Sequence, residues 1–243
     1  MTEIKICGIT NIEDALCAAD CGVDALGFNF HEPSPRYVTP ERAREIISAL
    51  PADIVRVGIF VNREAGEVKR TAEGCGMDLI QLHGDESPEY CRQFPAERII
   101  KAVSPRTPEE LPALDAYDVR AFLMDSREPG RYGGTGKQTD WNLAAMLGRK
   151  RPLILAGGLR EENIAEALSA VAPQAVDINS GIERTPGVKD HGRMRRIVAI
   201  IRRESPVGPG VIFGDFVKSK FSPPSAGGDE GEGIRDFLRG RHL

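Results

Sequence analysis

Short, almost continuously apolar runs alternate along the chain with longer stretches of helical periodicity, and the alternation continues to about residue 204. A run that is apolar at consecutive positions, rather than at every second one, is typical of a parallel β-strand that is buried on both faces. Eight runs have this character: "IKICGI", "ALGFNF", "IVRVGIFV", "LIQLHG", "RIIKAV", "AFLMDS", "PLILAGG" and "AVDINSG". The pattern therefore predicts a sheet of eight parallel strands.

The stretches between these runs carry apolar side chains at spacings i, i+3, i+4 and i+7, as expected for helices that bury one face. Three such stripes are Ala43, Ile46, Ile47 and Leu50; Ile164, Ala167, Leu168 and Val171; and Met194, Ile197, Val198 and Ile201. Thr39-Pro40 and Ser87-Pro88 each place a capping hydroxyl before a proline, which predicts a helix start at both positions.

Eight strands, each followed by a helix, predict a TIM barrel of the α/β class, a (β/α)8 fold with eight parallel strands and outer helices, over residues 1–204. The alternative is a doubly wound open sheet. Its dinucleotide-binding fingerprint is missing after the first strand, where the sequence reads only "CGIT".

The alternating pattern stops at residue 205. The segment 205–243 is rich in glycine and proline and contains two small apolar islands, "VIFGDFV" and "IRDFL". This composition predicts a flexible C-terminal extension with a single docking strand or short helix and no part in the chemistry.

The composition limits the kinds of binding partner and indicates the cellular location to be expected. The chain has 243 residues, 41% of them hydrophobic and 28% charged, and a net charge of -4, a balance that predicts no binding to nucleic acid or to an anionic membrane. The start "MTEIKICGIT" does not resemble a secretory signal, and no apolar run is long enough to span a bilayer. The five cysteines show no metal-type spacing with histidines, so we expect a reduced, cytoplasmic protein without a metal site.

The predicted topology selects candidate site residues, because barrel enzymes carry their active sites at the carboxyl ends of the strands. Gln81, His83 and Asp177 are candidates for substrate binding on this ground. The full set at strand ends is Cys7, Asn29, Gln81, His83, Asp125, Gly157, Gly158, Asp177, Ser180 and Gly181.

The loops after the seventh and eighth strands are candidates for a phosphate site. Barrels commonly hold a phosphate there, on backbone N–H groups. Gly157 and Gly158 would let the backbone approach an anion closely, and Ser180 with Gly181 would add a hydroxyl and a further N–H. The alternative is that these glycines serve only the conformation of two tight turns.

A second glycine-rich stretch, "GGTGKQTDW", resembles a nucleotide-binding P-loop but does not satisfy its pattern. Arg131 stands where the first glycine is required, and Gln138 replaces the Ser or Thr after Lys137. We therefore expect a loop after the sixth strand that could close over the site.

Three residues have side chains suited to acid–base chemistry or to binding a carboxylate. Asp125 follows the apolar "AFLM", and partial burial would keep a carboxyl protonated as a general acid; the alternative is an Asp that braces its loop. Cys7 would accept a proton only if a nearby cation or donor favours the thiolate, and otherwise it is a buried structural cysteine. Arg36 in "SPRY" matches a carboxylate in shape, and the alternative is a surface arginine.

Eight motifs, in the same order along residues 3–203, resemble those of the phosphoribosylanthranilate isomerase family of tryptophan biosynthesis. They are "KICGIT", "GFNFHEPSPRYV", "VGIFVN", "IQLHGDE", "FLMDS", "GGTGKQTDW", "LILAGGL" and "DINSGIERTPGVKD". The resemblance implies an Amadori rearrangement of a phosphosugar, without a cofactor, in a monomer or homodimer. It also implies that Cys7 is the general base, that Asp125 is the general acid, that Arg36 binds the anthranilate carboxylate and that the two glycine-containing loops bind the phosphate.

Two alternatives to this function stay open at the level of the sequence. A related phosphosugar barrel isomerase of histidine biosynthesis typically has an aspartate in place of Cys7 and a second phosphate site, but no second glycine pair follows the third or fourth strand. A catalytically silent phosphosugar-binding barrel would have no physical need for Cys7, Asp125 and Arg36 together.

Overall fold

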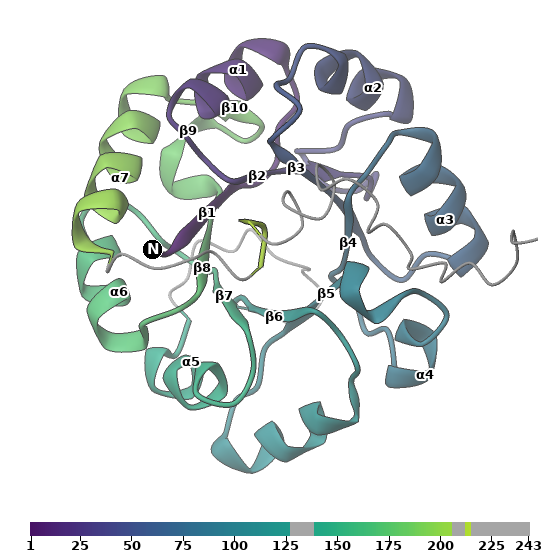
Figure 1. Cartoon of the computed structure of the whole chain (residues 1–243), viewed down its shortest axis with the longest axis vertical. Helices are drawn as coiled ribbons and strands as arrows, with labels where there is room; N and C mark the ends of the chain where they lie inside the picture. Colours follow the sequence, from purple (N-terminus) through teal and green to yellow (C-terminus); the bar gives the residue numbers. More distant parts are fainter. Residues whose placement is uncertain (127–138, 206–211, 215–243) are drawn as a thin grey trace, which may run out of the picture.

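Eight parallel strands close into a barrel in the computed structural model, which describes residues 1–126, 139–205 and 212–214. Each strand pairs with its neighbours in sequence order, and β1 pairs with β8 to complete the closure (Figure 1). The strands are β1 Glu3–Ile6, β2 Ala25–Asn29, β3 Val55–Phe60, β4 Leu79–Leu82, β5 Ile99–Val103, β6 Ala121–Met124, β7 Leu153–Leu155 and β8 Ala175–Ile178. The predicted barrel is confirmed, and the open sheet is excluded.

Helices surround the barrel and cover the outer face of its strands (Figure 1). The α-helices are α1 Ile12–Asp20, α2 Pro40–Ser48, α3 Ala65–Gly74, α4 Pro88–Cys91, α5 Trp141–Gly148, α6 Ile164–Val171 and α7 His191–Glu204. Thr39 and Ser87 cap α2 and α4 by accepting backbone N–H groups, and a proline follows each cap, as predicted.

The connection between β5 and β6 differs from the expected helix. It forms a 3-10 helix, η2 Pro108–Ala116, with Pro112 inside it. Proline has no N–H to donate, and its ring clashes with the preceding turn of an α-helix, so this segment cannot continue as a regular α-helix. Two further 3-10 helices are η1 Ala96–Arg98 and η3 Ser180–Ile182, and η3 leads into a hairpin of β9 Glu183–Thr185 and β10 Val188–Lys189.

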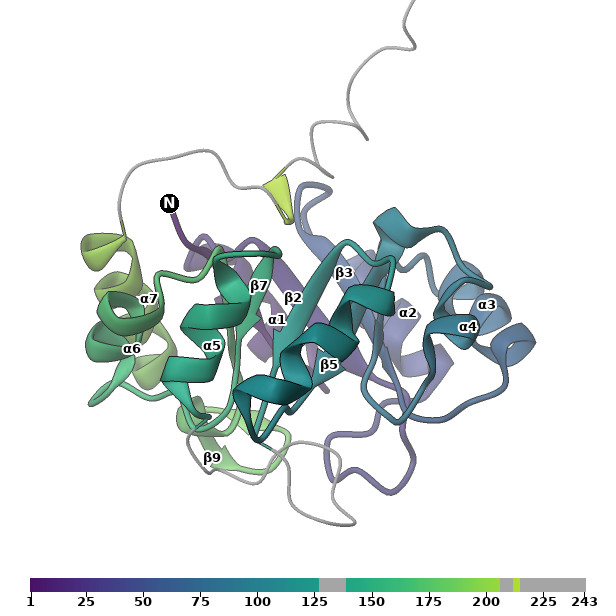
Figure 2. The ribbon, with the colours of Figure 1, turned by 90° about the horizontal axis from the view of Figure 1, so that it is seen from below.

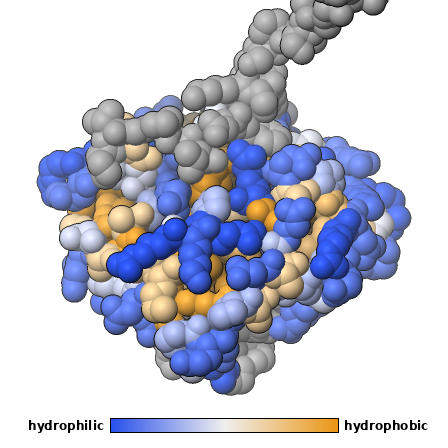
Figure 3. Space-filling model, turned by 60° about the horizontal axis from the view of Figure 1, so that its bottom comes forward, coloured by the Kyte–Doolittle hydropathy of each residue, from blue (hydrophilic) through white to orange (hydrophobic). Residues whose placement is uncertain are grey.

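Consecutive residues of each strand point alternately into the barrel and toward the helices, which explains why the runs are apolar without a break. On β4, for example, Leu79 belongs to the cluster inside the barrel, whereas Ile80 and Leu82 belong to the cluster under the helices. Away from this core, hydrophilic side chains cover most of the described surface visible in Figure 3, with apolar areas between them.

Residues 212–214 close the end of the barrel at which the strands begin. Figure 2 shows them at the same end as the N-terminus, opposite β9. Ile212 and Phe213 are fully buried in the cluster inside the barrel, and Glu3 accepts the backbone N–H groups of Ile212, Phe213 and Gly214 at 2.8, 2.9 and 2.6 Å. The rest of the predicted extension, apart from Ser205, lies outside the described residues.

Removing residues 212–214 is expected to reduce the stability of the fold without changing the activity of the folded protein. Replacing Phe213 by Ala deletes a fully buried ring and should lower the free energy of unfolding by about 3–5 kcal/mol. Truncation after Ser205 should have an effect at least as large. Thermal unfolding followed by circular dichroism measures both, and an unchanged melting temperature in the truncated chain would contradict the inferred contribution of residues 212–214. Activity per folded molecule should stay at the wild-type level, because the strand ends that carry the candidate site lie at the other end of the barrel.

Candidate active site

Cys7 lies just beyond β1 and is buried beside a charged pair inside the barrel. Lys5, two residues earlier on the strand, is fully buried, and its Nζ donates to Asp177 Oδ1 at 2.8 Å. Lys5 and Asp177 are direct neighbours across the β1–β8 pairing. Because alternate residues of a strand share a face, Lys5 also comes within hydrogen-bonding reach of the Cys7 thiol.

The charges around Cys7 act on its proton in opposite directions. Burial raises the pKa of the Cys7 thiol above its usual value, and the carboxylate of Asp177 raises it further. Lys5 and Lys189 favour the thiolate and lower that pKa, but they do not cancel the effect of burial. The thiol is therefore the main form at neutral pH, and the two ammonium groups reduce the cost of deprotonating it.

Gly27 on β2 leaves the space that this group requires. A Cβ at this position would lie 3.1 Å from Cys7 Sγ and 3.1 Å from Lys5 Nζ, closer than most real Cβ contacts. A larger residue at position 27 would therefore force the thiol and the ammonium to move.

Asp125, His83 and Gln81 form a chain of polar contacts from the end of β6 to β4. Asp125 Oδ2 lies 3.5 Å from His83 Nε2, and His83 Nδ1 lies 2.7 Å from Gln81 Nε2. With the Gln81 amide as donor, Nδ1 accepts, and the proton of a neutral His83 ring is on Nε2, toward Asp125. Asp125 Oδ1 also accepts the N–H of Ser126 at 2.8 Å, so the carboxyl braces its loop as well.

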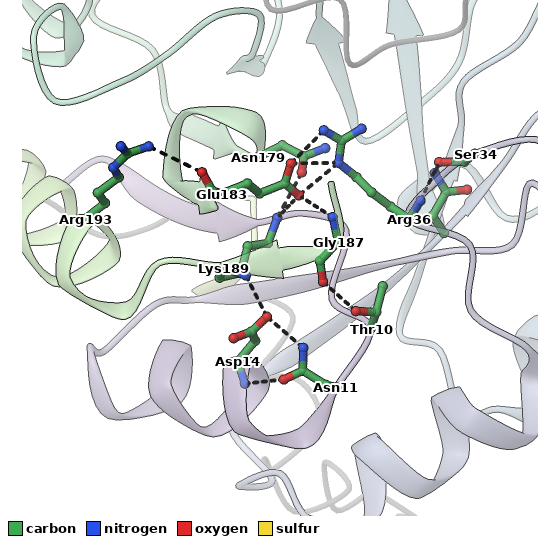
Figure 4. A network of polar contacts seen from close by, with 11 residues as sticks. Thr10, Asn11, Asp14, Ser34, Arg36, Asn179, Glu183, Gly187, Lys189 and Arg193 are labelled. Carbon is green, nitrogen blue, oxygen red and sulfur yellow. Dashed lines mark hydrogen bonds and ion pairs between the residues drawn. The ribbon is translucent and has the colours of Figure 1, made fainter. Parts of the chain in front are cut away.

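Arg36 is buried, and Glu183 holds it along one edge of its guanidinium. Arg36 Nε and Nη2 donate to Glu183 Oε1 and Oε2 at 2.9 and 2.7 Å, and Lys189 Nζ donates to Glu183 Oε1 at 2.8 Å (Figure 4). Burial opposes the charged form of Arg36, but the hydrogen bonds and charge of Glu183 outweigh it and raise the guanidinium pKa. The surface-arginine alternative is therefore wrong.

The two glycine-containing loops lie against one another. Gly157 and Gly158 have φ angles of 85° and 64°, which glycine adopts at low cost. A Cβ on Gly181 would overlap the carbonyl oxygen of Leu159, so η3 packs directly on the loop after β7. A Cβ on Gly157 would lie 3.2 Å from Asp125 Oδ1, which places this loop beside the candidate acid.

The sequence-predicted residues thus lie in one continuous region at the carboxyl ends of the strands. Asn29 braces the "HEPSPRY" loop: its Nδ2 donates to Ser34 Oγ, and its Oδ1 accepts the N–H of His31. The predicted loop "GGTGKQTDW" lies outside the described residues except for its last three.

Sequence reasoning missed three charged residues of this region: Lys5, Glu183 and Lys189. Lys5 gave a usable signal, since a lysine inside an apolar strand two residues before Cys7 must share its face. Glu183 and Lys189 lie on the β9–β10 hairpin, and their spacing alone does not show that Glu183 contacts Arg36, 147 positions away.

Residues 1–126, 139–205 and 212–214 contain no group of three or more His, Cys, Asp and Glu side chains that could hold a metal ion. Among the helices of the same ranges, none is long and apolar enough to cross a membrane.

Comparisons with known proteins agree on one family. The family model described as N-(5'-phosphoribosyl)anthranilate (PRA) isomerase matches residues 4–200. An N-(5'-phosphoribosyl)anthranilate isomerase from Syntrophus aciditrophicus is 54% identical over 203 residues, which cover 84% of this chain and 88% of that protein.

Solved structures give the same result. Phosphoribosyl anthranilate isomerase from Thermotoga maritima superimposes with a TM-score of 0.76 at 42% identity, covering 84% of this chain and all of that one. The enzyme from Thermus thermophilus gives a TM-score of 0.75 at 38% identity, covering 83% and 99%. A further structure, at 39% identity and a TM-score of 0.74 over 84% of this chain and 100% of that one, is a complex with reduced 1-(o-carboxyphenylamino)-1-deoxyribulose 5-phosphate.

The closed barrel, with ionisable side chains gathered at the carboxyl ends of its strands, has the architecture of a (β/α)8-barrel enzyme. Within that class, the match over residues 4–200 and the 54% identity show that the chain belongs to the N-(5'-phosphoribosyl)anthranilate isomerase family.

Replacing Gly181 by Ala tests the contact between the two loops. The added Cβ would collide with a backbone carbonyl that cannot turn away, so we expect a loss of about 1–3 kcal/mol of stability together with weaker binding of inorganic phosphate. Gly74, the last residue of α3, has open space around it, and Gly74→Ala is the matched control, expected to be neutral or slightly stabilising. Equal melting temperatures and phosphate affinities for the two variants would contradict the prediction for Gly181.

Proposed function

We propose that this chain converts N-(5'-phosphoribosyl)anthranilate to 1-(2-carboxyphenylamino)-1-deoxyribulose 5-phosphate, with Asp125 as general acid and Cys7 as general base. These roles are supported by the different charged and polar groups that surround the two side chains. Cys7 has two ammonium groups close by, and Asp125 has His83, while the two groups stand on different strands at one end of the barrel.

The acid step opens the sugar ring. Asp125 donates its proton to the ring oxygen, the bond from that oxygen to C1 breaks, and the nitrogen lone pair forms an iminium at C1. The His83 Nε2–H, 3.5 Å from Asp125 Oδ2, is placed to stabilise the carboxylate that remains.

The base step forms the enolamine. The Cys7 thiolate takes the proton from C2, the C2–H electrons form the C1=C2 bond, and the electrons of the C1=N bond return to nitrogen. The enolamine then gains a proton at C1 and loses the proton of its C2 hydroxyl, which gives the ketone. No cofactor is required, because the substrate's own nitrogen accepts the electrons.

The ends of the substrate carry fixed negative charges that would hold it in place. Arg36 would bind the anthranilate carboxylate, and the backbone of Gly157, Gly158 and Gly181, with the Ser180 hydroxyl, would bind the phosphate. Fixing both ends orients the C2 proton toward Cys7, and such positioning contributes a large part of the rate. Asp177 would act through its ion pair with Lys5 rather than by touching the substrate, and Gln81 would act through His83.

The alternatives considered from the sequence are not favoured. The relatives at about half identity carry the anthranilate isomerase name, not that of the histidine-pathway enzyme, and a silent barrel does not explain the charges kept around Cys7. A cytoplasmic location, the absence of nucleic-acid and membrane partners, and a monomer or homodimer remain predictions. The Thermotoga maritima relative is described as dimeric.

Substituting the proposed acid and base separately tests the assignment. Cys7→Ser and Asp125→Asn should each reduce kcat by about 10²- to 10⁴-fold, because each removes one proton-transfer group and keeps the side-chain shape. The decay of substrate fluorescence measures turnover. Cys21→Ser, a half-buried thiol at the end of α1, is the control and should keep wild-type activity. Full activity in the folded Cys7→Ser protein would remove the proposed base, and the absence of turnover in the wild type would refute the proposed function.

The raised pKa of Cys7 gives a prediction for the pH dependence. The Asp125→Asn variant isolates this group, because an amide does not titrate and loss of the protonated acid can no longer offset the gain of thiolate. Since burial keeps the thiol protonated near neutrality, the residual kcat/KM of Asp125→Asn should rise with pH across about pH 6 to 9 as the thiolate fraction grows. A flat profile in this variant would show that Cys7 is not the group that must lose a proton.

A further inference from the structure

The guanidinium of Arg36 is immobilised by contacts that leave one of its two hydrogen-bonding edges out of the network. Glu183 takes the edge formed by Nε and Nη2 in a two-point contact. Within the described part of the chain, Arg36 Nη1 donates no hydrogen bond, so the edge formed by Nη1 and the second hydrogen of Nη2 is available for another carboxylate.

The aliphatic part of the Arg36 side chain and its backbone are also held in place. Gly8, at a φ of 71°, lies under the side chain, and a Cβ there would be 2.7 Å from Arg36 Cδ. The Arg36 N–H donates to Ser34 Oγ at 3.2 Å, which fixes the backbone as well. The guanidinium therefore presents its remaining edge in one orientation.

The carboxylate of Glu183 is held in place by several buried hydrogen bonds. Its Oε1 accepts from Arg36 Nε, from Lys189 Nζ at 2.8 Å and from the Gly187 N–H at 3.1 Å. Lys189 Nζ also donates to Asn179 Oδ1 at 2.9 Å (Figure 4). The carboxylate cannot turn away from Arg36 without breaking several buried hydrogen bonds.

The charges of the three residues explain why a buried carboxylate beside Arg36 does not repel a second one. Burial lowers the pKa of Lys189, and Glu183 opposes that effect; with Lys189 protonated, the group of Arg36, Glu183 and Lys189 carries a net charge of +1. Without Lys189, the Arg36–Glu183 pair would be neutral, and an approaching carboxylate would gain little.

We propose that Glu183, supported by Lys189, is the positioning residue that holds the free edge of Arg36 toward the substrate carboxylate, and thereby sets selectivity for substrates that carry one. This proposal rests on the proposed function, because it takes the anthranilate carboxylate as the ligand of Arg36.

The Glu183→Gln variant distinguishes an effect of Arg36 orientation on substrate binding from an effect of the net charge of the site. The substitution raises the net charge of the group, so charge alone predicts tighter binding of an anion, whereas lost orientation predicts weaker binding. We expect KM for phosphoribosylanthranilate to rise about tenfold or more, with a smaller change in kcat. Calorimetry with reduced 1-(2-carboxyphenylamino)-1-deoxyribulose 5-phosphate should show a similar loss of affinity, and the same compound without its carboxyl group should bind wild type and variant equally.

A matched control comes from the opposite end of the barrel. Arg56 and Asp78 form a two-point pair with distances of 2.8 and 2.9 Å, at the start of β3 and just before β4, and Asp78→Asn should leave KM unchanged. Should Glu183→Gln fail to fold, Glu183→Asp keeps the charge with a shorter reach and should give an intermediate rise in KM.

The outcomes are distinguishable. Unchanged or tighter binding of the carboxylated compound by the folded Glu183 variant, or an equal loss for the compound without the carboxyl group, would overturn the positioning role while the wild type still turns over substrate. A wild type that neither turns over substrate nor binds the reduced product would overturn the proposed function, and this inference with it.

Discussion

The ion pair between Lys5 and Asp177 lies at the seam where the first and last strands close the barrel. The two residues are direct partners in the β1–β8 pairing, and Lys5 is completely buried. A slip of one residue at this seam would turn both side chains to the opposite face, where the apolar layer under the helices has no partner for them. An unpaired buried charge costs about 3–5 kcal/mol, so the pair favours a single register. The same register brings Cys7 to the end of β1.

The pair also divides the barrel interior into two parts. Toward the start of the strands the interior is apolar, and Ile212 and Phe213 complete it from outside the strands. Toward the carboxyl ends it is polar and charged, because Lys5 and Asp177 begin a set of ionisable groups that continues into the loops. Stability and chemistry are thus placed at opposite ends of one fold, as in barrel enzymes generally.

The charged groups at the working end are tied together across loops that are distant in sequence. The β9–β10 hairpin binds Arg36 through Glu183, and the N–H of Lys189 donates to Asp14 at the start of α1. The hydroxyl of Thr10 adds a further contact, to the Gly187 carbonyl, so loops after β1, β2 and β8 form one hydrogen-bonded unit. A two-point contact fixes an arginine more closely than a single ion pair does, which suits a site that must orient a small substrate.

The sequence by itself determined the strand count, the helices with their caps, the barrel and the position of most candidate residues, because these depend on short-range periodicity and on which residues end each strand. It also indicated Gly157, Gly158 and Gly181, whose positive φ angles or close contacts leave no room for a side chain. Only the tertiary structure showed that Glu183 holds Arg36, that Lys5 faces Asp177 and that residues 212–214 fill the barrel end. These contacts join residues about 150 to 210 positions apart, and no local pattern in the chain encodes such a distance; the closure of the sheet creates it.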